Sequence, residues 1–249
     1  PVIYLELKNY FENRLAFREL LRDIALGLKE IGAKTDTFDF VYAIYIRAYG
    51  ISEPIEDENE RKYQQKIRKW VKLLHFIPVL GQVVKFGETL WDTAVKELKE
   101  KYRKTKIEKE LREIIEVDDP IGKIMDAIKK NQELADLLLS MILAHNISKH
   151  MVKAPIVLIM DSLEYLKNAS EKQIELGKEL WIRGERITYL ESLIEMIGRI
   201  RGALIILAGR IEAEKIEKIP KKVRELKLIS EENIEKMLKK NRIENEELR

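Results

Sequence analysis

The stretch APIVLIMDSLEYL, Ala154–Leu166, decides the fold, because a short apolar run in it ends abruptly on an acid. Five of the six residues before Asp161 are large and apolar, and a second acid, Glu164, follows three residues later. A continuous apolar run of this length is typical of a parallel strand that is covered on both faces. The stretch therefore predicts a buried strand with two carboxylates at its carboxyl end.

A second run of the same kind, GALIILAGR, spans Gly202–Arg210, and Ser170–Arg201 between the two runs is predicted to be one long helical segment. Together they predict a βαβ unit with parallel strands. A right-handed crossover places the ends of both strands at one edge of the sheet. We therefore expect Asp161 and Arg210 to face the same crevice.

The rest of the chain predicts an α/β fold dominated by helices. Val2–Leu7 is rich in β-forming residues, and Tyr10–Gly32 has helical spacing and ends on a glycine, as helices often do. Residues 39–149 are helical in period and heavily charged. We expect residues 1–38 and 150–249 to form the α/β core and residues 39–149 to form a large helical insertion.

Composition limits the class of protein. With 46 basic and 43 acidic residues, the net charge of +3 gives no global field that would indicate a nucleic-acid partner. The absence of cysteine excludes a disulfide scaffold, a thiolate zinc site and a cysteine nucleophile, and it favours a cytoplasmic location. No apolar window is long enough to span a membrane. Heavy use of lysine and glutamate fits the surface ion-pair networks of a thermophile.

The two carboxylates after the first apolar run suggest nucleotide chemistry. In open α/β sheets, ligands bind beyond the carboxyl ends of the strands. An aspartate at such a tip can hold hydrated Mg²⁺, and an acid a few residues later can orient the attacking water. The alternative is a strand followed by a helix, with Asp161 or Ser162 as its N-cap and Glu164 in its first turn.

Three segments resemble consecutive parts of one family. IVLIMDSLEYL (Ile156–Leu166) resembles the Walker B segment of P-loop ATPases of the STAND branch, relatives of the AAA-type ATPases. GALIILAGR resembles the sensor strand that follows, which commonly ends in Gly-Arg or Thr-Arg. VRELKLISEENIEKML (Val223–Leu238) is similar to the next strand and helix start. The resemblance implies a parallel sheet of the P-loop NTPase type.

The resemblance also implies a function and a site. The function is that of a switch domain that binds and hydrolyses ATP with Mg²⁺. Asp161 would hold Mg²⁺, Glu164 would act as general base or water orienter, and Arg210 would read the terminal phosphate. Ser162 and Gly209, their neighbours in the two motifs, would lie beside the nucleotide.

One part of the family pattern is missing from the sequence. Gly27–Thr35, GLKEIGAKT, approaches the phosphate-loop (Walker A) pattern, but an alanine is inserted before Lys34 and the first glycine lies inside a predicted helix. The resemblance places the loop, and the central strand that feeds it, before residue 1. We therefore expect either a groove beside strand 202–210 or a displaced strand 223–228.

Two other functions stay open from the sequence. One is an inactive helical scaffold or interaction module, with an unidentified protein partner or self-association. The other is nucleic-acid binding by Arg61–Lys72, RKYQQKIRKWVK, which has six basic residues and no acid. The favoured interpretation of that segment is instead a solvated helix face paired with the acidic residues before it. Residues 76–91 predict either core packing or a hairpin that binds a membrane or a partner.

Overall fold

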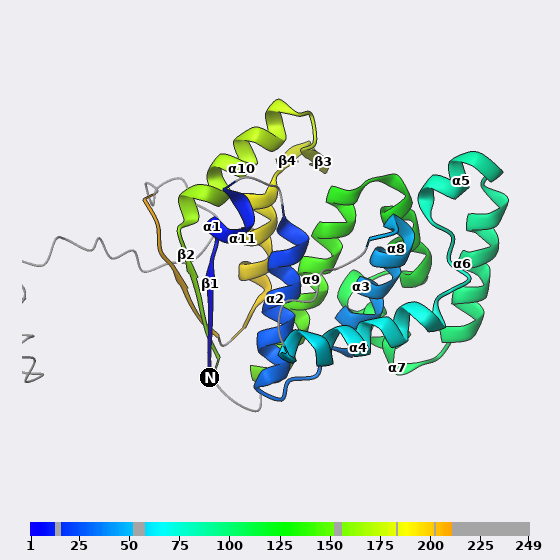
Figure 1. The fold of residues 1–249 in the computed structure, drawn as a ribbon, viewed down its shortest axis with the longest axis horizontal. Coiled ribbons are helices and arrows are strands. Elements are labelled where there is room, and N and C mark those ends of the chain that lie inside the picture. The colour runs from blue at the N-terminus through cyan, green and yellow to red at the C-terminus, as the bar shows by residue number, and fades with distance from the viewer. Residues whose placement is uncertain (13–15, 52–57, 152–155, 183, 202, 211–249) are drawn as a thin grey trace, which may run out of the picture. The chain divides into compact units, whose positions relative to one another are not determined.

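The computed structural model describes residues 1–12, 16–51, 58–151, 156–182, 184–201 and 203–210. Within them, a parallel sheet has the strand order β1-β2-β5 (Figure 1). Its strands are β1 (Val2–Glu6), β2 (Val157–Asp161) and β5 (Leu204–Leu207). The three predicted strands in this part of the chain, and their parallel pairing, are confirmed. The predicted strand 223–228 and the helix after it lie outside the described residues.

The two faces of this sheet differ sharply in exposure. Ile3, Leu5, Leu158 and Met160 are buried on one face, where α2 packs against β1. Alternation along the strands places the other side chains on the opposite face, which we call the outer sheet face: Val2, Tyr4, Glu6, Val157, Ile159, Asp161, Leu204 and Ile206. Four of its apolar side chains are between 41% and 61% exposed. Parallel sheets are usually covered on both faces, so this face is unusual within the described part of the chain.

Helices fill the sequence between β1 and β2. They are α1 (Lys8–Phe11), α2 (Phe17–Glu30), α3 (Asp36–Tyr49), α4 (Glu58–Leu73), α5 (Leu80–Phe86), α6 (Thr89–Tyr102), α7 (Lys106–Ile115), α8 (Pro120–Lys130) and α9 (Gln132–Met151). Helices α3 to α9 lie together to one side of the sheet (Figure 1). The protein is therefore dominated by helices, as predicted.

Two of these helices form the centre of the core. Eleven of the 14 residues of α3 are buried, and α9 contacts α2, α3, α7, α8 and α11. A helix that is surrounded by other elements has apolar residues around most of its circumference. Buried side chains continue without interruption from the sheet into these helices. The division into an α/β core and an insertion of residues 39–149 stays a prediction.

The single long helix predicted for Ser170–Arg201 is wrong. The chain instead forms α10 (Leu163–Glu175), a hairpin of β3 (Leu180–Ile182) and β4 (Glu185–Ile187), and α11 (Tyr189–Arg199). Gly177 and Gly184 have φ angles of +62° and +83°, which end α10 and turn the hairpin.

The hairpin and the helix after it carry two aromatic residues in different surroundings. Trp181 lies on β3 and is 67% exposed. Tyr189 begins α11, is buried, and stacks on Phe17 with 5.3 Å between the ring centroids.

The basic segment forms α4 and is anchored by acids of α3. Lys66 Nζ lies 2.6 Å from an Asp36 oxygen and 2.9 Å from an Asp39 oxygen, and Asp39 is fully buried. Trp70 packs edge-on against Phe40 with 5.5 Å between the ring centroids. The tryptophan that could have stacked on a nucleic-acid base is thus engaged in packing. The acidic residues 52–57 lie outside the described residues.

Residues 76–91 contribute partly to the core. Ile77, Val83 and Trp91 are buried, whereas Val84 is 89% exposed. Among the described residues, no helix combines the length and the apolar character that crossing a bilayer requires.

Candidate functional site

The turn after β2 holds Asp161 in a defined orientation. Ser162 has a left-handed backbone with φ 63° and ψ 45°, and its N–H donates to Asp161 Oδ1 at 2.7 Å. A residue other than glycine in this conformation costs on the order of 1–3 kcal/mol, and such residues cluster at functional sites. The tight turn starts α10 at Leu163 immediately after the strand.

The other Asp161 oxygen faces the neighbouring strand. Tyr4 donates its hydroxyl to Asp161 Oδ2 at 3.3 Å, and Glu6 lies directly opposite Asp161 in the β1–β2 register. Desolvation of the Tyr4 hydroxyl and the charge of Asp161 raise the pKa of Tyr4, so the hydroxyl stays protonated and donates. Both carboxylate oxygens of Asp161 therefore accept hydrogen bonds.

Glu164 is tied to the chain that leaves β5. The Leu163 N–H donates to the Ala208 carbonyl at 3.0 Å, and the Arg210 N–H donates to Glu164 Oε2 at 3.0 Å. These two bonds join the start of α10 to the carboxyl end of β5. Asp161, which ends β2, and Arg210, which follows β5, therefore lie at the same edge of the sheet on adjacent parallel strands, as the βαβ prediction requires.

Gly209 is required by this close approach. A Cβ atom at Gly209 would lie 2.7 Å from the Leu163 backbone nitrogen and 2.8 Å from Glu164 Oε2. Both distances are too short for any side chain. The five residues predicted for the site, Asp161, Ser162, Glu164, Gly209 and Arg210, thus belong to two segments that touch each other: the end of β2 with the start of α10, and the chain after β5. Their roles toward a nucleotide stay predictions.

Replacing Gly209 by alanine should destabilise the fold by about 1–3 kcal/mol, because the backbone at Leu163 cannot move aside without breaking the turn. Gly198 is the matched control. It lies in α11 with open space around its Cβ position, so Gly198→Ala should stabilise by about 0.5–1 kcal/mol. Chemical denaturation of both variants measures the difference. Equal free energies of unfolding for the two variants would contradict the close contact at Gly209.

A Mg²⁺ ion at this edge of the sheet would need ligands in addition to the carboxylates. Mg²⁺ prefers oxygen ligands, keeps several waters, and is usually bound through one or two carboxylates and substrate phosphates. Asp161, Glu164 and Glu6 supply oxygens at the edge. In the described ranges there is no group of three or more His, Asp or Glu side chains placed to hold a metal by themselves. The residues fit an ion completed by water and phosphate.

Sequence reasoning missed Tyr4 as part of this site. The residue lies 157 positions from Asp161, and only the pairing of β1 with β2 brings them together. A signal was present in the alternation of VIYLEL, because Tyr4 and Glu6 must share a face once β1 lies beside β2.

The stretch that approaches a phosphate-loop pattern is a packing contact. Gly27 lies inside α2, where its Cβ position would be 3.0 Å from the Ile3 side chain. The glycine allows α2 to approach β1 closely, and its N–H belongs to a helix.

Comparisons with known proteins add no assignment. No family model matches this chain, and neither a curated protein nor a solved structure does. Function therefore has to be inferred from the residues at the sheet edge and their geometry.

Proposed function

We propose that this chain belongs to an ATP-binding and hydrolysing switch domain of the STAND type, related to the AAA ATPases. The observation that supports the proposal is the contact between the turn after β2 and the chain after β5. It gathers Asp161, Glu164 and Arg210 at the carboxyl edge of a parallel sheet, where α/β proteins bind their ligands.

Each residue would have a separate task in hydrolysis. Asp161 would hold Mg²⁺, which neutralises phosphate charge when it is bound. Glu164 would orient the attacking water and accept its proton as the bond to the γ-phosphorus forms. The bond between that phosphorus and the ADP oxygen breaks, so that ADP and inorganic phosphate leave. Arg210 would stabilise the charge that develops on the transferred group.

The strain at Ser162 and the lack of space at Gly209 agree with this proposal. Both features fix the two segments relative to each other, and catalysis of phosphoryl transfer depends mainly on positioning and electrostatics. The proposal also requires a phosphate-binding loop, which the stretch Gly27–Thr35 does not provide, because Gly27 lies inside α2.

The test is Mg²⁺-dependent ATP binding by the full-length protein, measured with a fluorescent ATP analogue in Mg²⁺ and in EDTA. Asp161→Asn should weaken binding in Mg²⁺ by about 10-fold or more, because the neutral amide is a poor Mg²⁺ ligand. It should also remove most of the difference between Mg²⁺ and EDTA. Asp92→Asn, on the exposed side of α6, is the control. Wild-type affinity in the Asp161 variant would refute the metal assignment.

A second candidate function is an interaction module without hydrolysis. The outer sheet face favours it, because Val2, Tyr4, Leu204 and Ile206 expose apolar surface that a partner could cover. Full-length protein that binds no ATP in the same assay would favour this function over the first.

A further inference from the structure

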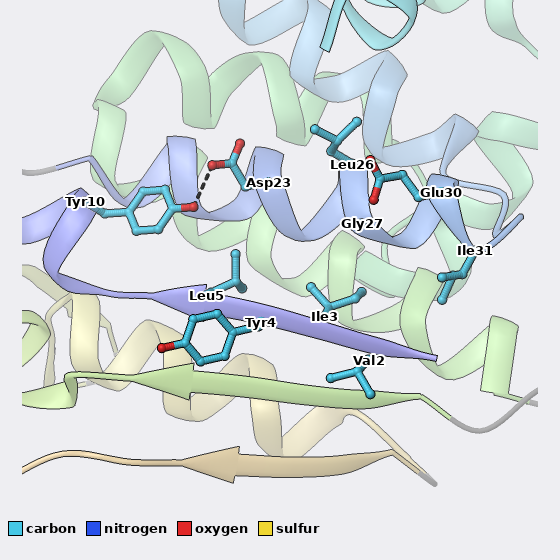
Figure 2. Close-up of a pocket in the computed structure, with 10 residues that line it drawn as sticks. All are labelled: Val2, Ile3, Tyr4, Leu5, Tyr10, Asp23, Leu26, Gly27, Glu30 and Ile31. Atoms are coloured by element: carbon cyan, nitrogen blue, oxygen red, sulfur yellow. Dashed lines mark hydrogen bonds between the residues drawn. The ribbon is translucent and has the colours of Figure 1, made fainter. Parts of the chain in front are cut away.

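We propose that the edge of β1 opposite β2, which no other described strand pairs with, binds an extended, basic peptide as an additional strand. A groove of about 360 Å³ runs between this edge and the start of the helical region (Figure 2). Ten residues line it: Val2, Ile3, Tyr4, Leu5, Tyr10, Asp23, Leu26, Gly27, Glu30 and Ile31. The proposal goes beyond ATP hydrolysis and does not depend on it.

On the side away from β2, the backbone of β1 pairs with no other strand of the described residues. The β1–β2 ladder uses the odd-numbered residues of β1, since Val157 N–H donates to the Pro1 carbonyl and Leu7 N–H donates to the Asp161 carbonyl. In a parallel strand, the N–H and C=O groups of one residue point to the same side. The groups of Val2, Tyr4 and Glu6 therefore point away from β2. Such a row of donors and acceptors is the template for strand addition.

A hydrogen bond and an ion pair connect side chains on the opposite wall of the groove. Tyr10 donates its hydroxyl to Asp23 at 2.6 Å, and Asp23 also pairs with Arg22 at 2.8 Å. Figure 2 shows this joined pair near Leu5, while Glu30 and Ile31 lie toward the Val2 end. The groove is thus bounded at both ends by side chains of the helical region.

The charge of the groove selects the kind of peptide. Asp23 and Glu30 are the charged residues among the ten that line it, and both are acidic, but Asp23 is already paired with Arg22. Glu30 is therefore the acid with which a basic peptide would pair. Glu6 adds a third acid at the end of β1. Leu26 gives the wall apolar surface between Asp23 and Glu30, and Ile31 adds apolar surface beyond Glu30 (Figure 2). An extended peptide with apolar residues at its centre and lysine or arginine at its ends complements this arrangement.

The length of the site sets the length of the peptide. The five residues of β1 span about 16 Å at the rise of a strand, so a peptide of about five residues matches it. A suitable probe is acetyl-Lys-Val-Thr-Val-Lys-amide with a fluorescent label. Its control is the same peptide with N-methyl groups at alternate residues, which cannot donate to the edge.

The experiment measures peptide binding by fluorescence polarisation and maps it by amide hydrogen exchange. The probe should bind the wild-type protein and protect the Tyr4 and Glu6 amides, whereas the N-methylated peptide should not. Glu30→Lys should weaken binding about fivefold, as the loss of an ion pair worth about 1 kcal/mol does. Glu100→Lys, which makes the same charge change on the exposed side of α6, should leave binding unchanged.

Any of four results would overturn the proposal. They are no binding of the probe, equal binding of the N-methylated peptide, equal affinities of the Glu30 and Glu100 variants, and protection that maps to β5 in place of β1. Because no nucleotide is present in these measurements, their failure leaves the ATPase proposal standing, and a failed ATP assay leaves the peptide site standing.

Discussion

Replacing Glu164 by glutamine is expected to lower the rate of ATP hydrolysis by the full-length protein about 100- to 1,000-fold, with little change in ATP affinity. Glutamine fills the same space, and its carbonyl oxygen can still accept the hydrogen bond that the Arg210 N–H donates to Glu164. It cannot take up a proton from water. The variant should therefore keep the fold and the bound nucleotide while losing turnover.

The measurement is single-turnover hydrolysis together with a binding titration. Glu171→Gln is the matched control, because Glu171 lies on the same helix and its side chain is 61% exposed. Hydrolysis at the wild-type rate in the Glu164 variant would remove this residue from the mechanism. A fall in thermal stability larger than that of the control would instead show that the bond to Arg210 is structural.

The second large effect concerns a buried acid in the helical core. Asp136, on α9, is 2% exposed, and its Oδ1 has no hydrogen-bond partner among the described residues. Burial raises its pKa from 3.8 to about 8, against the attraction of Arg18 and the Tyr45 hydroxyl. In the folded protein the acid is therefore protonated over a pH range in which it would be ionised in the unfolded chain.

Because the pKa of Asp136 is higher in the folded than in the unfolded state, the free energy of unfolding falls as the pH rises. The folded state binds the extra proton, so its stabilising contribution is fully present below pH 4 and is lost as the pH rises toward about 8. The slope is at most about 1.4 kcal/mol per pH unit, and the total is on the order of several kcal/mol. Asp136→Asn cannot ionise. It should thus be more stable than the wild type at pH 9 and should lose that advantage at pH 5.

Chemical denaturation at several pH values tests this expectation. Subtracting the curve of the variant from that of the wild type removes the contribution of other titrating groups. Asp126→Asn, on the exposed side of α8, should give a flat difference. A flat difference for Asp136 as well would mean that Arg18 keeps the acid ionised in the fold.

The strands of the sheet could be predicted from the sequence, because each one has a local pattern that is typical of a strand. The apolar runs before Asp161 and before Arg210 are too short for most helices and end on polar residues, so their strand character and parallel pairing could be anticipated. The two segments of the site could be placed at one edge for the same reason. Their direct contact at Gly209 could not, since it depends on the exact separation of the segments.

The hairpin and the buried acid show where pattern reasoning failed. Residues 170–201 keep a helical spacing of apolar residues, which concealed the change of direction at Gly177 and Gly184. The strongly apolar stretch of α9 around Asp136 predicts a buried helix, but the sequence does not show that the acid itself lies inside the core. Both depend on tertiary neighbours, which a single sequence does not identify.

Tyr4 belongs to two places at once: it lines the groove beside β1, and its hydroxyl reaches Asp161. A strand added beside β1 would restrict this side chain, and a cation at Asp161 would compete for the oxygen to which it donates. The two binding events would then be thermodynamically linked. Linkage is reciprocal, so any factor by which the peptide changes cation affinity is the factor by which the cation changes peptide affinity. Through the Tyr4 side chain, binding of a peptide beside β1 would change the affinity for a cation at Asp161, and the cation would change the affinity for the peptide.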